Sequence, residues 1–348
     1  MISIHDAHSL EQLRSRLRFD PHCIRRLRKV FFKKQGTADD ALTEIPEPHR
    51  DEARREISFH ALTLHSRHDS AHDGASKLLF RTAEGQLIES VILRIASGRT
   101  SLCISSQVGC AVRCRFCATG QKGLIQDLTR DSILDQVIQA NQLLRDEGRS
   151  IRNVVFMGMG EPLLNESAVY ESVETLISPD CFNLSPNKVL ISTVGIPDAM
   201  LRCAERFPRV RMALSLHSAR QSEREKLIPL ARRYPLHALR ESIARVTAIQ
   251  RRPLMIEYLL LEGVNDSAED LDALIDYLNH LDVHLNLIPY NPISAATDLR
   301  GTPIQRRRAF AETLTDAGFK VTMRYSLGSD IAAACGQLAT REDIAGRF

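Results

Sequence analysis

Apolar segments and amphipathic segments alternate along the chain from Ser101 onward. The apolar segments are short and near-continuous, whereas RDSILDQVIQANQLLRDEG and EDLDALIDYLNHL repeat with the period of a helix. This alternation predicts parallel β/α units. The seven predicted strands are 101–105, 154–160, 188–193, 211–217, 254–261, 284–290 and 320–325. We therefore predict an α/β fold built on a partial (β/α)6-type barrel, in which ligands bind at the carboxyl ends of the strands.

The part of the chain before residue 90 has a different pattern. The stretch 14–34 carries nine basic residues and one acid, Asp20, which is a local balance of +8. Apolar residues recur within it at helical spacing, at Cys23, Ile24, Leu27, Val30 and Phe31. This predicts an amphipathic helix with a basic outer face. The acidic stretch 37–57 predicts a second helical region, broken at Pro46 and Pro48.

These patterns divide the chain near residue 90. We predict a small N-terminal helical accessory domain with a hairpin linker over 1–90, a barrel over 91–328 and a C-terminal segment over 329–348. The alternating run FRTAEGQLIESVILRI indicates the hairpin itself, between residues 78 and 95.

Composition narrows the setting without identifying a function. The chain has 348 residues and 43% hydrophobic content, enough for a large core. Its eight cysteines are too sparse for a secreted disulfide framework, and the start MISIHDAHSLEQ has no signal-peptide pattern. No apolar run approaches the ~20 residues that a membrane span needs. We therefore expect a cytoplasmic protein with no membrane partner, in which thiols stay reduced and an iron–sulfur cluster can be assembled.

The net charge of +3 does not by itself indicate nucleic-acid binding, so the distribution of charge must decide. A basic run on one helix face is often only a solvated surface. The concentration of positive charge in 14–34 also suits contact with backbone phosphates. We predict RNA contact by the accessory domain, with the solvated surface as the alternative.

Three cysteines stand close together in the run CAVRCRFC, at Cys110, Cys114 and Cys117. Their C-x3-C-x2-C spacing suits three irons of a cubane [4Fe–4S] cluster, whose fourth iron keeps no protein ligand. S-adenosylmethionine (SAM) can chelate that open iron, and the spacing resembles the radical-SAM signature. Two alternatives compete. Cys103 would complete a zinc knuckle, although the usual C-x2-C pairs are absent, or the thiols would simply be buried in a run too polar for a core.

Further polar residues fall where the predicted strands end. In GMGEP, Gly160 allows the backbone to approach a ligand, and Glu161 can accept from an ammonium or a ribose hydroxyl. The later strands end with Ser192, with the LSLH residues Ser215, Leu216 and His217, and with Asn291. Each alone is more typical of an ordinary strand end, but together they converge on one rim and predict a SAM-binding edge.

Seven runs occur in order between residues 89 and 338. They are LCISSQVGCAVRCRFCATG, FMGMGEPLLN, STVGIP, LSLH, GVND, NLIPYNP and DIAAACGQL. Together they resemble the RlmN/Cfr family of radical-SAM RNA methyltransferases. The resemblance implies a radical-SAM barrel, a [4Fe–4S] cluster, SAM, and methylation of an adenine ring carbon in 23S rRNA. Carbon 2 and carbon 8 both stay open, and some RlmN-type members also modify tRNA.

The resemblance also implies roles for two more cysteines and a glutamate. Cys335 would take a methyl group from one SAM, and a second SAM, cleaved at the cluster, would remove hydrogen from it so that the methylene radical adds to adenine. Cys103 would then resolve the protein–RNA thioether through a transient disulfide with Cys335, and Glu89 would accept a proton. Without the resemblance, both cysteines would be interpreted as buried thiols. An electron donor such as a flavodoxin-type protein is implied, and we expect a monomer.

The chain departs from the family pattern at two places that border the expected RNA site. Ala332 stands where the family often has Asp, and the run IPLA at 228–231 replaces methionine–proline–isoleucine–asparagine. Two other classes stay open. One is a radical-SAM enzyme acting on another RNA, such as tRNA, or on a non-RNA substrate. The other is a non-catalytic RNA-binding protein with a structural metal, which would leave the rim motifs without a purpose.

Overall fold

A computed structural model describes residues 1–95 and 98–339. At its centre is a ten-stranded sheet in the order β14-β13-β12-β11-β10-β9-β6-β5-β4-β3. Seven neighbouring strands are parallel, and each overlaps one of the seven predicted segments, so the predicted parallel strands are confirmed. These strands are β6 (Thr100–Cys103), β9 (Asn153–Phe156), β10 (Val189–Thr193), β11 (Arg211–Ser215), β12 (Leu254–Leu260), β13 (Val283–Pro289) and β14 (Lys320–Met323).

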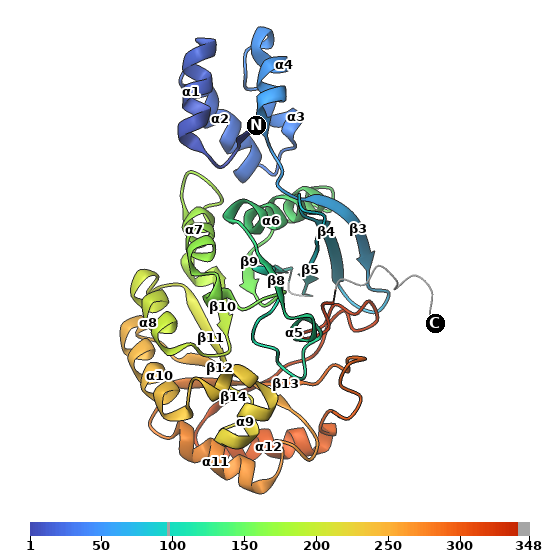
Figure 1. The fold of residues 1–348 in the computed structure, drawn as a ribbon, viewed down its shortest axis with the longest axis vertical. Helices are drawn as coiled ribbons and strands as arrows, with labels where there is room; N and C mark the ends of the chain where they lie inside the picture. Colours follow the sequence, from blue (N-terminus) through green and yellow to red (C-terminus); the bar gives the residue numbers. More distant parts are fainter. Residues whose placement is uncertain (96–97, 340–348) are drawn as a thin grey trace.

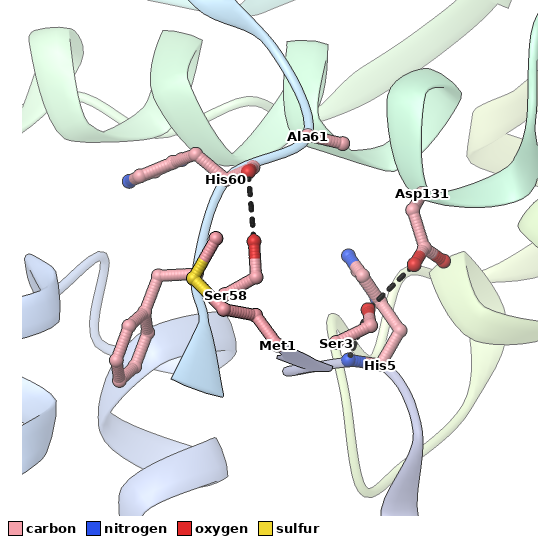
Figure 2. A pocket seen from close by; sticks show the side chains of 8 residues that line it. Met1, Ser3, His5, Ser58, His60, Ala61 and Asp131 are labelled. Atoms are coloured by element: carbon pink, nitrogen blue, oxygen red, sulfur yellow. Dashed lines mark hydrogen bonds between the residues drawn. The ribbon is translucent and has the colours of Figure 1, made fainter. Parts of the chain in front are cut away.

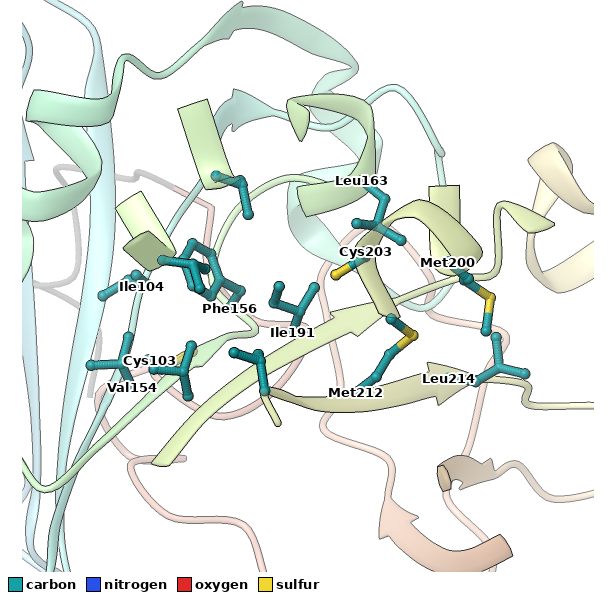
Figure 3. Packing of buried hydrophobic residues seen from close by; sticks show 14 of the residues in the cluster. Cys103, Ile104, Val154, Phe156, Leu163, Ile191, Met200, Cys203, Met212 and Leu214 are labelled. Atoms are coloured by element: carbon teal, nitrogen blue, oxygen red, sulfur yellow. The ribbon is translucent and has the colours of Figure 1, made fainter. Parts of the chain in front are cut away.

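Helices connect successive parallel strands and pack on one face of the sheet (Figure 1). They are α6 (Arg130–Arg145), α7 (Glu166–Ile177), α8 (Pro197–Arg206), α10 (Leu236–Gln250), α11 (Ala268–Leu278) and α12 (Ile304–Asp316), while the short α9 (Gln221–Leu227) follows β11. Phe156, Ile191 and Met212 of the strands pack with Met200 and Cys203 of α8 in this core (Figure 3). Alternate strand residues therefore face the other side, where the site lies. Within 1–95 and 98–339, no helix is both long and apolar enough to cross a bilayer.

Three antiparallel strands extend the sheet beyond β6. The predicted hairpin is confirmed as β4 (Ala75–Arg81) and β5 (Leu87–Arg94), and β5 pairs with β6 through Val91 and Cys103. The outer strand β3 (Thr63–Asp69) pairs with β4. The hairpin thus continues the main sheet, which brings Glu89 of β5 beside the first parallel strand.

Four helices and one strand pair precede this sheet. They are β1 (Ile2–Ser3), α1 (Ala7–Leu17), α2 (His22–Lys33), α3 (Ala38–Leu42), α4 (Glu47–Glu56) and β2 (Ile57–Ser58). The amphipathic pattern is confirmed in α2, which buries all five predicted apolar residues. The basic stretch nevertheless begins on α1, because Arg18 takes a left-handed φ of 56° and Pro21 precedes a new helix. The predicted break at Pro48 is wrong, because Pro48 lies in the first turn of α4, where helical N–H groups have no partner.

One turn of α6 connects the N-terminal helices to the sheet. Asp135 hydrogen-bonds His60 Nδ1 at 2.7 Å and accepts the two N–H groups that follow His60, both at 2.8 Å. The next residue, Gln136, exchanges two hydrogen bonds with the backbone of Ser105, just beyond β6, at 2.8 and 2.9 Å. Both side chains are buried, so the connection and the end of β6 share one anchor.

A polar cavity of about 350 Å³ lies at the same junction (Figure 2). It is lined by Met1, Ser3, His5, Ser58, Phe59, His60, Ala61 and Asp131. The Ser3 hydroxyl donates to the Asp131 carboxylate across it, which joins β1 to α6. The cavity therefore belongs to the contact between the N-terminal helices and the barrel.

Candidate active site

The three predicted cluster cysteines lie on one loop near the carboxyl end of β6. This loop joins β7 (Gln107–Gly109) to α5 (Ala118–Lys122), and β8 (Leu124–Asp127) pairs antiparallel with β7. The Cys110 N–H donates to the Gly123 carbonyl at 2.9 Å. Gly109 is required here, because its φ of +76° is left-handed and a Cβ would lie 1.9 Å from the Gly123 carbonyl oxygen. The backbone therefore folds the loop back on itself around the cysteines.

The surrounding protein shields the three thiols from water, and neighbouring thiols further raise the pKa values of Cys110 and Cys114. Burial raises the pKa of Cys110 to about 12, and the carboxylate of Glu161 and the Cys117 thiol add to the shift. The pKa of Cys114 is raised by burial, by Cys117 and by Cys110. Such thiols keep their protons until a metal replaces them. Cys103, which a zinc knuckle would need, packs instead in the main core (Figure 3).

The metal-binding side chains in the run CAVRCRFC are its three cysteine thiols. Among the residues that the structure describes, no three His, Cys, Asp or Glu side chains converge on a single-ion position. A cubane needs no such convergence, because it spreads its three thiolates over three irons. Three thiolates are the ligands that a [4Fe–4S] cluster with one open iron requires.

The C-terminal segment that carries Cys335 is docked on the cluster loop. The Ala118 N–H donates to the Gly336 carbonyl at 2.7 Å, and the Thr119 hydroxyl donates to the Leu338 carbonyl at 2.6 Å. Gly336 has a left-handed φ of +84°, and a Cβ there would lie 3.1 Å from the Phe116 carbonyl oxygen. Two motifs distant in sequence thus form one hydrogen-bonded unit.

Cys335 lies close enough to Cys103 to influence its thiol electrostatically. Burial raises the pKa of Cys103 well above its usual value, and Cys335 raises it further. Cys335 is exposed, and Asn291 holds it by donating from Nδ2 to its carbonyl at 3.1 Å. Its thiol still has a raised pKa, because the surrounding protein displaces water and Glu257 adds negative charge. The two cysteines predicted to work as a pair therefore lie within electrostatic range.

Glu89 lies on the same face of the sheet as Cys103. It precedes Val91, the partner of Cys103 in the β5–β6 ladder, by two residues. Its buried carboxylate accepts the Ala339 N–H at 2.9 Å and forms an ion pair with buried Lys77 at 3.4 Å. Lys77 escaped prediction, because a lysine in an alternating strand normally indicates a solvent-facing position.

Glu161 ties two strand ends together. Its carboxylate accepts the Leu163 N–H at 3.1 Å and the Val194 N–H at 2.9 Å, and its own N–H donates to Gln107 Oε1 at 2.8 Å. Burial raises the pKa of Glu161 to about 7, although these N–H donors favour the ionised form. Gly160 beside it needs its φ of +101°, because a Cβ would lie 2.6 Å from Gln107 Cβ. The carboxylate keeps lone pairs for a ligand.

The LSLH run turns sharply at His217, whose φ is 58°. Its buried ring accepts the Leu259 N–H on Nδ1 at 3.0 Å, and burial together with Arg224 lowers the pKa of His217 to about 3. The neutral ring packs edge-on against Phe116 of the cluster loop, with centroids 4.8 Å apart. Leu216 is buried, and both its N–H and its carbonyl are hydrogen-bonded within the protein.

Ser192 and Ser215 share the face of the sheet opposite the helices. Their neighbours Ile191 and Leu214 point into the helix-covered core, and Ser192 pairs with Ala213, two residues before Ser215. Both serines are only half-buried. The predicted rim residues thus fall into two groups. The side chains of the two serines make no hydrogen bond within the described residues, whereas Glu161, His217, Leu216 and Asn291 are already engaged with the protein.

Two residues that sequence reasoning missed hold this rim in place. Arg224 of α9 is buried and donates to the carbonyls of Leu216 at 3.1 Å and of Val194. Asn265, in the GVND run, donates to the His217 and Leu259 carbonyls, both at 2.6 Å. Arg224 stands among other charged residues in RQSEREKL, so the sequence pattern does not mark it as buried.

The predicted basic surface of α2 is smaller than the charge count implies. Arg16 pairs with Glu56, Arg26 pairs with Glu44, and Arg28 lies over the Phe32 ring. On α2 and its C-cap residue, four exposed cations make no side-chain hydrogen bond or ion pair to the described residues, namely Arg25, Lys29, Lys33 and Lys34. We call these four side chains the α2 cations.

Comparisons with known proteins agree with this geometry. The family model "Radical SAM superfamily" matches residues 104–278. A "Probable RNA methyltransferase" of Rhodopirellula baltica is 51% identical over 98% of this chain and 89% of its own length. A "Probable dual-specificity RNA methyltransferase RlmN" of Thermus thermophilus is 40% identical over 86% of this chain and 84% of its own.

A solved structure is similar over nearly the whole chain. The crystal structure of a radical SAM methyltransferase from Sphaerobacter thermophilus superposes with a TM-score of 0.91 at 35% identity, covering 97% of this chain and 99% of that one. The family implies SAM and a [4Fe–4S] cluster as cofactors. With the cluster loop, the docked Cys335 segment and these relatives together, the chain belongs to the RlmN family of radical-SAM RNA methyltransferases.

Proposed function

We propose that the chain methylates a ring carbon of an adenine, carbon 2 or carbon 8, in 23S rRNA, with Cys335 as methyl carrier and Cys103 as resolving thiol. The observation that supports the proposal is that the Cys335 segment lies on the cluster loop and close to Cys103, although more than 200 residues separate Cys335 from both in sequence. A protein that only bound RNA would have no need for two adjacent thiols at this place.

In this proposal Cys110, Cys114 and Cys117 hold the cluster, which together with SAM supplies the radical that activates the methyl group on Cys335. Asn291 positions the Cys335 backbone for this exchange. Glu89 is held by Lys77 in reach of the Cys103 face, where a base can take the adenine ring proton or the thiol proton.

Resolution is the task of Cys103. Its sulfur attacks the sulfur of Cys335, so that an S–S bond forms while the S–CH2 bond to adenine breaks. The bond electrons stay with the carbon, which takes a proton and becomes the methyl product. A thiol reductant then reduces the disulfide. Because burial raises the pKa of Cys103, this thiol stays protonated and unreactive until a base acts on it.

The proposal also covers the enzyme's electron donor, oligomeric state, location and second RNA substrate. We include a flavodoxin-type electron donor, a monomeric enzyme and a cytoplasmic location, where thiols are kept reduced. A second RNA substrate, tRNA, is supported by the words "dual-specificity" in the names of relatives that are 36–42% identical.

The decisive experiment is anaerobic turnover with methyl-deuterated SAM, reductant and either rRNA or tRNA transcript, followed by nucleoside mass spectrometry against 2-methyladenosine and 8-methyladenosine. Label in either methyladenosine from rRNA supports the proposal, and label from tRNA alone makes tRNA the substrate. Unlabelled RNA from a protein that cleaves SAM would refute it.

Two cysteine variants test the mechanism. Cys103→Ala should accumulate a covalent RNA adduct, found as a mass shift on Cys335 after nuclease trimming, whereas Cys335→Ala should form neither adduct nor product. Cys181→Ala, a buried thiol away from the site, is the matched control and should turn over. Normal turnover by Cys103→Ala would contradict the two-thiol mechanism.

A further inference from the structure

The face of β11 to β14 opposite the helices is lined by polar and charged side chains. Ile256 of β12 and Leu285 of β13 point into the helix-covered core. The residues directly before and after each of them along its strand therefore point to the opposite face. Across the ladder, Met255, His284 and Lys320 form one row. The next row on this face is Glu257, Asn286 and Thr322. Hydrogen bonds from Asn286 to Glu257 at 3.0 Å and between His284 and Thr322 at 2.8 Å confirm that these side chains share the face.

Positive charge outnumbers negative charge on this face. Arg211 lies two residues before Ala213, which pairs with Met255, and Arg324 follows Thr322 by two residues, so both continue the same face as Lys320. Arg211, Lys320 and Arg324 are exposed. None of the three side chains makes a hydrogen bond or an ion pair within the described ranges 1–95 and 98–339. The acid on these two rows, Glu257, is buried and already bonded to Asn286.

These cations act as one electrostatic cluster. Burial, Arg252 and Arg324 lower the pKa of Arg211. Burial, Lys320, Arg211 and Arg324 likewise lower the pKa of His284. Glu257 offsets part of this positive charge, because it raises the pKa of Arg211, and because Arg324 and Arg211 oppose the rise that burial causes in its own pKa. The remaining excess of like charge repels itself and attracts an anion. The face is therefore suited to a bound anion.

One end of this face, at Arg324 and Glu257, borders Cys335. Arg324 and Glu257 both act on the Cys335 thiol, Arg324 by lowering its pKa and Glu257 by raising it. Tyr325, directly after Arg324, is 83% exposed, the most exposed large aromatic side chain among the described residues. An exposed aromatic ring beside unpaired cations is the combination that proteins use to stack a base and hold its phosphates.

We propose that this face binds backbone phosphates of the RNA that carries the target adenine, with Arg324 beside the adenine and Arg211 and Lys320 farther along the face, and that Tyr325 stacks on a neighbouring base. The inference rests on the proposed function, because it needs RNA as the substrate. It adds a second contact surface, beside Cys335 itself, to the one expected at the α2 cations. The accessory helices would then hold the RNA at a distance, while this inner face guides the reacting nucleotide.

Two kinds of variant separate charge from stacking. The triple variant Arg211→Gln, Lys320→Gln, Arg324→Gln should bind rRNA transcript more weakly and lower the log–log salt slope of affinity by roughly 2 to 3, at about 0.7 to 0.9 per phosphate. Tyr325→Leu should weaken binding by roughly 5- to 100-fold with the slope unchanged, and Tyr325→Phe should bind like the parent. The matched control neutralises three exposed cations outside this face, Lys188, Arg245 and Arg308, and should leave affinity and slope unchanged.

A second measurement needs no variant. In the parent protein, saturating rRNA transcript should protect Lys320 from acetylation by an amine-reactive reagent, while Lys188 stays reactive. Iron content and circular dichroism report whether the triple variant folds. If the variant does not fold, the protection of Lys320 in the parent protein tests the inference instead. Parent affinity and slope in a folded triple variant, or an unprotected Lys320, would overturn the inference. A parent that neither binds nor methylates RNA would instead overturn the proposed function.

Discussion

The buried ion pair between Lys77 and Glu89 offers a test whose magnitude follows from its geometry. The side chains of Lys77 and Glu89 are 3% and 1% exposed, and their charged atoms lie 3.4 Å apart. At an effective dielectric of about 20, the Coulomb attraction at this distance is roughly 5 kcal/mol. Lys77→Met removes the attraction and leaves Glu89 as an unpaired buried charge, which costs about 3–5 kcal/mol. The melting temperature should fall by roughly 6–20 °C, at about 2–4 °C per kcal/mol.

A double variant separates the pair from its neighbours. Lys77→Met with Glu89→Gln removes both charges, and because burying a neutral pair is often close to neutral, most of the lost stability should return. The double variant should still lack methylation, since Glu89 is the proposed base. The assay is thermal unfolding of both proteins beside the parent, with methylation measured in parallel. If Lys77→Met melts within about 1 °C of the parent, the two side chains are solvated and our account of this pair is wrong.

Three further changes have definite expected results. Cys114→Ala should lose bound iron and methylation together, and an iron assay showing full cluster content would contradict the cluster assignment. Replacing Arg25, Lys29 and Lys33 of α2 with Gln should lower the salt slope of RNA binding by roughly 2 to 3, while an unaltered slope would mean that these side chains are merely solvated. Ala332 has a left-handed φ of 50°, which costs a non-glycine residue about 1–2 kcal/mol. Ala332→Gly should therefore stabilise the protein by about 1 kcal/mol in thermal unfolding, and a lower melting temperature would contradict the strain.

The parallel strands could be predicted because burial on both faces leaves long apolar runs, such as LMIEYLLL in β12. The break between α1 and α2 could not, because one left-handed residue, Arg18, interrupts a charge pattern that continues on both sides. The cluster loop could be predicted from the spacing of its three cysteines alone. The contact between this loop and Gly336 could not be predicted, because it is made by a backbone hydrogen bond that does not depend on the pattern of side chains.

The missed site residues share one physical cause. Lys77 and Arg224 are charged side chains buried by partners far away in sequence, namely Glu89 and the carbonyls of Val194 and Leu216. A one-dimensional pattern assigns such residues to the surface, because the partners that stabilise them exist only in the folded chain.

The anchor on α6 has a consequence for how this enzyme would choose its nucleotide. Asp135 holds the connection from the accessory helices, and the adjacent Gln136 holds the backbone just beyond β6. The distance between the α2 cations and the reacting thiols is therefore fixed by the fold. An RNA that touches both must offer its adenine at that separation from the phosphates held by α2. The choice of adenine would then depend on the folded shape of the RNA more than on its base sequence. One enzyme could therefore accept different RNAs that share that shape.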